Sequence, residues 1–364
     1  MTDRLDRARK VLAEQGVGAL LVGPGADLGY LAGHHAPPLE RLTLLVVTPD
    51  ADPVLVLPEL EAPLAAGAGV DQVARLLPWG ETADPVALVV DHLRRAGAAT
   101  STLAVQDRLW SVFTLALQEA LPEARWLPGS RVMRELRLRK EPGEIAALHE
   151  VGAAIDRVHA AVPDLLRAGR TEAEVARDLD ALIREEHDEV NFIIVGSGPN
   201  GASPHHDVGD RRLEPGDSVV IDIGGTRNGY CSDMTRNYAI ERLPDGYGQL
   251  HEVLERAQQV AVDAVAPGAT AEAIDRAARK VIEDAGYGEH FIHRTGHGIG
   301  IEEHEEPWIV EGNDQVLEPG MAFSVEPGIY VPGRYGARIE DIVVVTEDGV
   351  DRCNHRPRQV VVCG

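Results

Sequence analysis

Two aspartates dominate the chemistry that this sequence can support. Asp222 follows the apolar run 218–221, and Asp233 lies eleven residues later, beyond a glycine-rich turn at 226–229. This pattern predicts two strands joined by a turn, with a carboxylate on each strand. A buried carboxylate without a partner is costly, so we favour a metal site over a solvated hairpin end.

The turn decides which residue faces Asp222. If the hairpin centre falls just before Asn228, Asp222 pairs with Asp233; if Asn228 and Gly229 form a two-residue primed turn, Asp222 pairs with Thr235. Both registers keep the carboxylates on one face, with Cβ atoms roughly 5 to 8 Å apart. Two ionised acids that close repel each other, so we expect a cation between them.

More candidate ligands follow downstream. His293, His297 and His304 lie among glycines, which disfavour a helical metal pair, and Glu326 and Glu340 are acids within apolar strands. A set of Asp, Asp, His, Glu and Glu suits two hard divalent ions with carboxylate bridges. Its oxygen-rich character favours manganese, iron or cobalt over thiolate-bound zinc.

The order and spacing of these residues resemble the creatinase/aminopeptidase P/methionine aminopeptidase superfamily, whose fold is called pita-bread. Within it, the chain is most similar to the Xaa-Pro peptidases, prolidase and aminopeptidase P. Six motifs between residues 198 and 341 carry the resemblance, and Tyr30–Gly33 adds an upstream segment. The motifs are Gly198–Gly201 with His205–His206, Ile221–Gly225, Ser232–Arg236, Gly296–Gly300 with His304–Pro307, Val325–Gly328 and Arg338–Asp341.

The resemblance implies a role for each candidate. The metal ligands would be Asp222, Asp233, His297, Glu326 and Glu340. Asp233 and Glu340 would be shared by two divalent ions, manganese first, with cobalt, iron or zinc as alternatives. Such a pair acidifies a bridging water, which attacks a carbonyl as hydroxide. The natural outcome is hydrolysis, with Glu326 also carrying the proton to the leaving nitrogen.

The remaining catalytic candidates surround this set. His205 and His304 would orient the scissile peptide or stabilise the oxyanion, and His293 would line the pocket. Arg338 would hold a ligand carboxylate from outside the metal shell. Other polar residues nearby are expected to have no catalytic role. His206 and Asp207 fit ordinary turn residues, and Glu302, Glu303, Glu305 and Glu306 fit solvated acids or an element that shapes the pocket rim. The arginines are expected to balance the acidic surface: Arg211, Arg212, Arg236 and Arg256.

The resemblance implies short peptides with proline in the second position as substrates. Dipeptidase activity and aminopeptidase activity on longer peptides both remain possible. A strict dipeptidase needs a cation that binds the free C-terminal carboxylate of its substrate. Some dipeptidases of the family have an arginine shortly after the segment that matches His304–Pro307, whereas here Trp308 follows Pro307. Arg294, Arg334 or a neighbouring subunit's arginine are candidates instead. A creatinase-like hydrolase of a small C–N substrate, or a binding module without chemistry, are rival interpretations. The intact five-residue ligand set argues against both.

Composition limits partners and location. The chain has 364 residues and a net charge of −24, so nucleic acid and anionic membranes are poor partners. Three cysteines form no paired pattern, and the charged N-terminus lacks an apolar signal, so we expect a cytoplasmic protein. The family resemblance predicts a homodimer in which His34–Arg41 restricts access to the active site.

The surrounding elements predict an α+β protein. Residues 1–128 alternate strand and helix and are expected to form a creatinase-like α/β domain. Residues 129–140 are expected to be a charged linker. Residues 141–364 contain long helices and antiparallel strand pairs, which fit a pita-bread catalytic domain. Pro142 suits the first turn of one helix, and Thr171 begins another with capping-box spacing.

Overall fold

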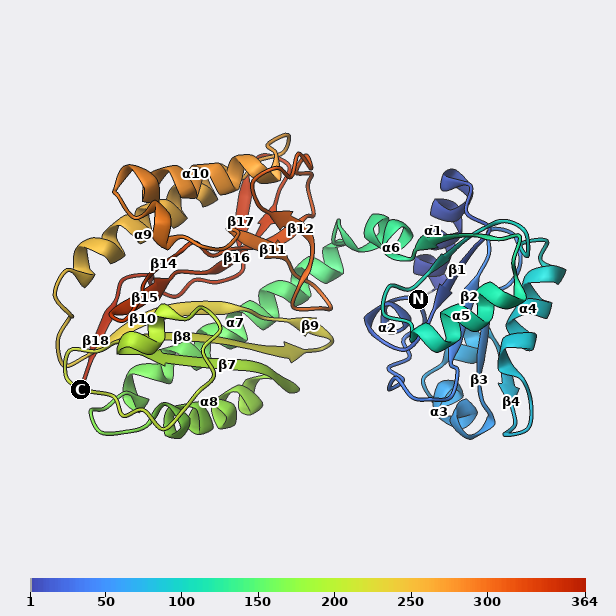
Figure 1. Cartoon of the computed structure of the whole chain (residues 1–364), viewed down its shortest axis with the longest axis horizontal. Coiled ribbons are helices and arrows are strands. Elements are labelled where there is room, and N and C mark those ends of the chain that lie inside the picture. Colours follow the sequence, from blue (N-terminus) through green and yellow to red (C-terminus); the bar gives the residue numbers. More distant parts are fainter. Residues whose placement is uncertain (1) are drawn as a thin grey trace. The chain divides into compact units, whose positions relative to one another are not determined.

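A computed structural model describes residues 2–364 and separates the chain after Arg137 into two compact units (Figure 1). The segment expected to be a linker, 129–140, is largely helical, because helix α6 (Ser130–Arg137) occupies most of it. Val132, Met133 and Leu136 of this helix are buried at helical spacing, so apolar burial explains why the segment folds.

The first unit is built on a six-stranded mixed sheet. Its strands in spatial order are β4 (Arg75–Trp79), β3 (Val54–Pro58), β2 (Leu44–Val47), β1 (Ala19–Val22), β5 (Thr102–Val105) and β6 (Arg125–Pro128). Strands β1, β2 and β3 are buried at every position. Both faces of the sheet are therefore covered, as their continuous apolar sequences predict.

Helices on the sheet provide that cover. They are α1 (Thr2–Gln15), α2 (Ala26–Ala32), α3 (Ala62–Gly67), α4 (Pro85–Arg95), α5 (Ser111–Ala120) and α6. Val89, Leu93 and Leu117 of α4 and α5 join one apolar core with the strands. Asp84 begins α4 by accepting hydrogen bonds from two backbone N–H groups, which supports the helix start.

The second unit holds two larger sheets. The first contains β18 (Val361–Cys363), β10 (Met234–Ile240), β8 (Ser218–Arg227) and β7 (Glu189–Ser197), with β9 (Tyr230–Cys231) paired to β8. The second contains β12 (Glu305–Ile309), β11 (Gly296–Gly298), β13 (Ala322–Val325), β16 (Asp341–Val345) and β17 (Val350–Arg352). The hairpin β14 (Gly328–Val331) and β15 (Tyr335–Arg338) forms a separate pair.

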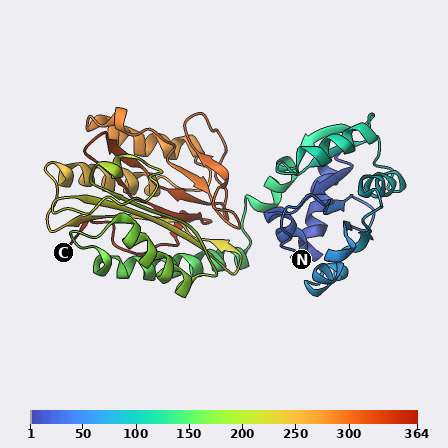
Figure 2. The same cartoon turned by 60° about the horizontal axis from the view of Figure 1, so that its bottom comes forward.

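Four helices flank these sheets. They are α7 (Pro142–Leu165), α8 (Glu172–Glu186), α9 (Tyr247–Asp263) and α10 (Ala271–Asp284). In both views α7 and α8 lie on one side of the strands and α9 and α10 on the other (Figure 2). Each helix pair shares an apolar core with strands, the first with β8 and β10 and the second with β13, β15 and β16. The polar side chains of the site gather among these strands.

Two further facts concern the chain as a whole. Among the described residues, no helix is both long and apolar enough to span a membrane. The three cysteines, Cys231, Cys353 and Cys363, are buried free thiols.

Candidate metal centre

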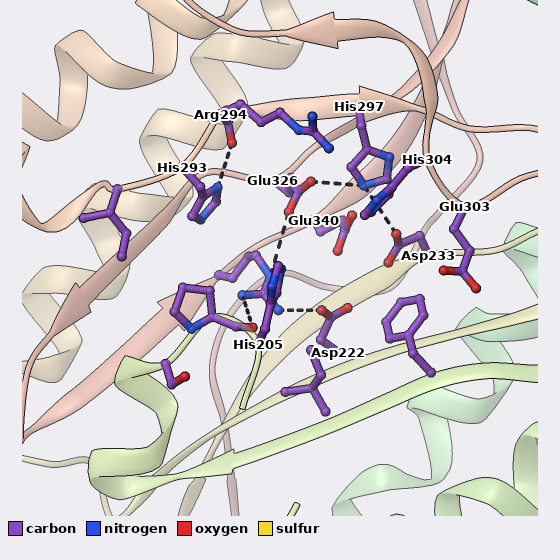
Figure 3. A pocket seen from close by; sticks show the side chains of 16 residues that line it. His205, Asp222, Asp233, His293, Arg294, His297, Glu303, His304, Glu326 and Glu340 are labelled. Carbon is purple, nitrogen blue, oxygen red and sulfur yellow. Dashed lines mark hydrogen bonds and ion pairs between the residues drawn. The ribbon is translucent and has the colours of Figure 1, made fainter. Parts of the chain in front are cut away.

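A cavity of about 760 Å³ in the second unit brings together all nine residues singled out in the sequence (Figure 3). These are His205, Asp222, Asp233, His293, His297, His304, Glu326, Arg338 and Glu340. The rest of its lining is Phe192, Ile194, Ser203, Pro204, Ile292, Arg294 and Glu303. Residues far apart in the chain thus form one site.

The β8–β9–β10 hairpin positions the two aspartates. Asp222 pairs with Thr235, so the structure adopts the register with a two-residue turn. Asn228 and Gly229 form that turn with φ of 52° and 79°, the left-handed values that a primed turn requires. Asp233 precedes β10 by one residue and lies on the same face as Thr235, so both carboxylates point into the cavity.

His297 presents one ring nitrogen to the acids. Its Nδ1 lies 3.1 Å from the carbonyl oxygen of Gly298, to which it donates, so Nε2 is the ring nitrogen that faces the acids. Nε2 lies 3.2 Å from Glu326 Oε1 and 3.6 Å from Asp233 Oδ2. A ring whose Nδ1 is bonded to a backbone carbonyl while Nε2 faces carboxylates matches the usual geometry of a metal-binding histidine.

The glycines beside His297 have a steric reason. A Cβ at Gly296 would lie 1.8 Å from the Ser324 carbonyl oxygen, and one at Gly298 would lie 2.1 Å from that of Glu306. Only glycine therefore lets β11 pass between its neighbouring strands at this point.

Three carboxylate oxygens in the centre have no hydrogen-bond donor among the described residues. They are Asp222 Oδ1, Asp233 Oδ1 and Glu340 Oε1, and all three are buried. An unsatisfied buried carboxylate oxygen is costly, and a cation is the partner that its chemistry calls for. The site residues therefore fit divalent metal ions.

Three groups of ligand atoms overlap in this centre, with the atoms of each group within 4.8 Å of one another. The groups are Asp222 with Asp233 and Glu340, His297 with Glu326 and Glu340, and Asp233 with His297 and His304. Asp233, His297 and Glu340 each belong to two groups, and of these only the two carboxylates have a second oxygen that could reach a second cation. This overlap is what two adjacent cations with shared carboxylates would require.

The charges of the centre influence one another strongly. Burial, followed by the charge of Glu340, raises the pKa of Asp233 well above its ordinary value. Burial also raises the pKa of Glu340 well above its ordinary value, and Glu326 adds to the effect. Burial opposes ionisation of Glu326 too, but the hydrogen bond and charge of His297 lower its pKa to about 2. The raised pKa values of Asp233 and Glu340 reflect burial and repulsion among neighbouring carboxylates, which a bound cation would relieve.

Arg338 connects the acids to the pocket wall. Its Nη2 donates to Asp222 Oδ2 across 2.5 Å and its Nε donates to Thr235 Oγ1 across 3.0 Å. Its Nη1 donates to the Tyr330 hydroxyl at 2.8 Å, and that hydroxyl lies 2.9 Å from His293 Nε2. Arg338 and His293 therefore belong to one hydrogen-bonded network.

His304 lies closer to solvent than the buried acids. His304 is exposed, and its ring centroid lies 4.0 Å from that of His297. Burial of part of its ring, together with the charges of His297 and Arg294, lowers the pKa of His304 to about 4. His304 is therefore neutral at physiological pH and can donate one N–H.

Several contributions were not apparent in the sequence. Glu303 lines the cavity and is half-buried, so it is part of the pocket wall and not a fully solvated acid, the other interpretation that the sequence allowed. Arg236, expected on the surface, is buried: it donates to Asp341 Oδ1 and to the Glu340 carbonyl oxygen, both at 2.6 Å. The surface interpretation of Arg236 was wrong, because its acceptors lie over a hundred residues away in the chain. Its position inside strand β10, which is buried at every residue, was the one feature of the sequence that could have indicated burial.

The comparisons with known proteins agree with this geometry. A model of metallopeptidase family M24 matches residues 146–347, and a creatinase/prolidase N-terminal domain model matches residues 4–139. The chain is 51% identical to "Probable dipeptidase PepE" of Mycobacterium tuberculosis over 99% of this chain and 96% of the relative. It is 36% identical to the Xaa-Pro dipeptidase of Lactobacillus helveticus over 98% of both.

A solved structure gives the same result. The crystal structure of dipeptidase PepE from Mycobacterium ulcerans superposes with a TM-score of 0.94 at 49% identity, covering 99% of this chain and 97% of the other. The predicted fold class, a pita-bread domain preceded by a creatinase-like α/β domain, is confirmed.

Proposed function

The chain belongs to metallopeptidase family M24, and from that premise we propose that it hydrolyses the bond between an N-terminal residue and proline in short peptides. The observation that carries this proposal is the convergence of three carboxylate oxygens that lack a hydrogen-bond donor with Nε2 of His297, which lies 3.2 Å from Glu326 Oε1. The names of its relatives, dipeptidase and Xaa-Pro dipeptidase, support the substrate class.

The proposed ligands are Asp222, Asp233, His297, Glu326 and Glu340. Asp233 and Glu340 would be shared between two ions, since each belongs to two ligand groups and has two carboxylate oxygens. Manganese suits this oxygen-rich set best, with cobalt, iron or zinc as alternatives. When bound, such ions supply an acidified water and polarise the scissile carbonyl.

The protein's own groups complete the hydrolysis. Glu326 is ionised, so it can accept the proton of the attacking water and deliver it to the proline nitrogen as the C–N bond breaks. His205 and His304 would orient the scissile carbonyl and donate to its oxygen as negative charge develops there. His293 and Arg338 would keep Asp222 and the pocket wall in place.

The charges of the cavity favour a dipeptide. Arg294 lies over the ring of Trp308, with the guanidinium carbon 4.3 Å from the ring centroid. Trp308 thus holds a cation in the cavity, although it occupies the position where some relatives carry an arginine. Glu303 and Arg294 lie on different sides of the His297–His304 pair (Figure 3). A cation and an anion placed apart complement the carboxylate and ammonium groups of a short zwitterionic peptide.

Assembly and location complete the proposal. We propose a homodimer in which His34–Arg41 limits the length of peptide that enters the site. We also propose a cytoplasmic location, because three buried free thiols suit a reducing compartment.

One assay tests the activity. Metal-free protein is reconstituted with manganese and offered Ala-Pro, Ala-Pro-Ala, Ala-Ala and creatine. We expect cleavage of Ala-Pro above all. Turnover of creatine alone would replace the peptidase by a hydrolase of small C–N substrates, and no turnover of any substrate would favour a binding module.

A further inference from the structure

His205 enters the cavity without any anchor of its own. It follows the short 3₁₀ helix Gly198–Ala202 in an irregular segment, and it is exposed. Its ring forms no hydrogen bond with any residue from 2 to 364. A side chain that acts on substrate must still be held in place, because small displacements of a catalytic group are costly.

The residues on either side of His205 are held instead. The carbonyl oxygen of Pro204 accepts a hydrogen bond from Arg338 Nη1 at 3.4 Å. The ring of His206 reaches the other way, and its Nε2 lies 2.8 Å from Glu172 Oε2. His205 thus lies between two residues that are each held by a contact, and the contact between His206 and Glu172 is the shorter of the two.

Glu172 is itself firmly fixed. It is the first residue of α8 and is fully buried. Its Oε1 accepts hydrogen bonds from the backbone N–H of Ser197 at 2.8 Å, from Ser197 Oγ at 2.6 Å and from Asn200 Nδ2 at 3.0 Å. These donors outweigh burial and lower the pKa of Glu172, so it is an anion at neutral pH.

The carboxylate thus joins two parts of one segment. Its Oε1 binds the turn that precedes His205, and its Oε2 binds the residue that follows His205. We propose that Glu172 is a positioning residue, which acts through His206 to hold His205 at the cavity. This proposal rests on the proposed peptidase function, in which His205 contacts the substrate.

Variants of His206 test the link without disturbing the other bonds of Glu172. His206→Phe keeps a ring but loses the donor, whereas His206→Gln keeps an N–H donor. We expect His206→Phe to lower kcat for Ala-Pro by ~10 to 100-fold with little change in KM or metal content, and His206→Gln to restore most of the loss. Asp207→Asn, on the exposed neighbour of His206, is the matched control and should behave like the wild type.

A double mutant separates positioning from a merely structural role. In a His205→Ala background, His206→Phe should lower kcat no further, because its effect passes through His205. An undiminished effect in that background, or wild-type kcat for His206→Phe alone, would overturn the proposal. Equal losses in the Phe and Gln variants would also overturn it.

A measurement without substrate keeps this proposal distinct from the proposed function. In histidine-labelled protein loaded with diamagnetic zinc in place of manganese, the ring signal of His205 is assigned by its loss in His205→Ala. We expect one sharp NMR signal in the wild type and in His206→Gln, and a broadened or shifted signal in His206→Phe. An unchanged signal in His206→Phe would contradict the proposal. Absence of Xaa-Pro cleavage by the wild type would contradict the proposed function alone.

Discussion

Arg338 and Asp222 form a buried ion pair across 2.5 Å that joins the β14–β15 hairpin to strand β8. The guanidinium donates a hydrogen bond to Asp222 Oδ2, whereas Oδ1 of the same carboxylate has no donor among the described residues. One oxygen is thus fixed by the protein, and the other is left for a cation. This division of roles within one carboxylate leads to the first two predictions.

Metal binding should stabilise the fold as well as support catalysis. Chelation should abolish Ala-Pro cleavage, and manganese or cobalt should restore it better than zinc. Because bound ions relieve repulsion among buried carboxylates, an ion present at 100 times its Kd should add about 2.7 kcal/mol of stability. Elemental analysis and thermal unfolding check this. Active protein with only trace metal would contradict it.

Substitutions should separate ligands from the residue that orients them. Asp233→Ala or Glu340→Ala removes one of the two acids that we propose are shared between the ions, and should silence the enzyme. Arg338→Ala should lower metal affinity or kcat by roughly 10 to 100-fold while the fold remains intact. Arg334→Ala, at the turn of the same hairpin, should leave both unchanged. Wild-type turnover by Asp233→Ala would rule out the shared-ligand assignment.

Arg294 should recognise the free carboxylate of the substrate. Arg294→Gln should raise KM for Ala-Pro by about 10-fold or more, because a charge-assisted bond contributes about 1.5–3 kcal/mol. The same variant should hardly affect Ala-Pro-amide, which lacks that carboxylate. Steady-state kinetics on both peptides measure the difference. Equal losses on the two peptides would show that Arg294 acts in another way.

Acid should destabilise the fold partly through His159. Its Nδ1 lies 3.0 Å from the Tyr238 hydroxyl and its Nε2 lies 3.0 Å from the Met234 carbonyl oxygen, and burial lowers its pKa to about 3. Below pH 6.5 the unfolded chain protonates this imidazole and the folded chain does not. Stability should therefore fall by up to about 1.4 kcal/mol per pH unit, from pH ~6.5 to ~3.

The variant His159→Gln isolates this contribution. Its stability should depend less steeply on pH than that of the wild type between pH 7 and 5. Denaturant unfolding of both proteins, with chelator present so that metal release does not contribute, measures the two slopes. Parallel slopes would show that His159 does not carry the effect.

Assembly can be tested separately from chemistry. Light scattering should give twice the mass of one chain. Replacing residues 34–41 by a short glycine-serine segment should then reduce the preference for Ala-Pro over longer Ala-Pro peptides, with metal content unchanged. A monomer that cleaves a dipeptide and a decapeptide equally well would contradict this prediction.

The sequence was most informative where local rules decide the structure. Alternation around Asp222 and Asp233 predicted a shared face in either of the two registers left open, and the structure adopts the one with Asn228-Gly229 as the turn. The capping box at Thr171 and Pro142 at the start of α7 are likewise present. These features depend on residues close together in the chain, so a single sequence contains them.

The sequence was least informative where a polar residue finds a distant partner. His206 looked like an ordinary turn residue, because Glu172 lies 34 positions away. Arg236 resembled a surface cation, since its acceptors belong to β16 and the C-terminal segment. The stacking of Arg294 on Trp308 was also hidden. Such pairs are fixed by how strands and helices pack, which composition and spacing do not encode.

The candidate ligands come from both large sheets, and this has a consequence for biosynthesis. Asp222 and Asp233 leave the ribosome long before Glu340. Thr235, whose hydroxyl donates a hydrogen bond to Glu340, lies 105 residues before that acid in the chain. A nascent chain that ends before residue 340 contains Asp222 and Asp233, whose charges repel each other, but lacks one of the proposed metal ligands. If the proposed ligand set is correct, we expect stable metal binding only in chains whose synthesis has passed the second sheet, and a product truncated before residue 340 should lack the complete site.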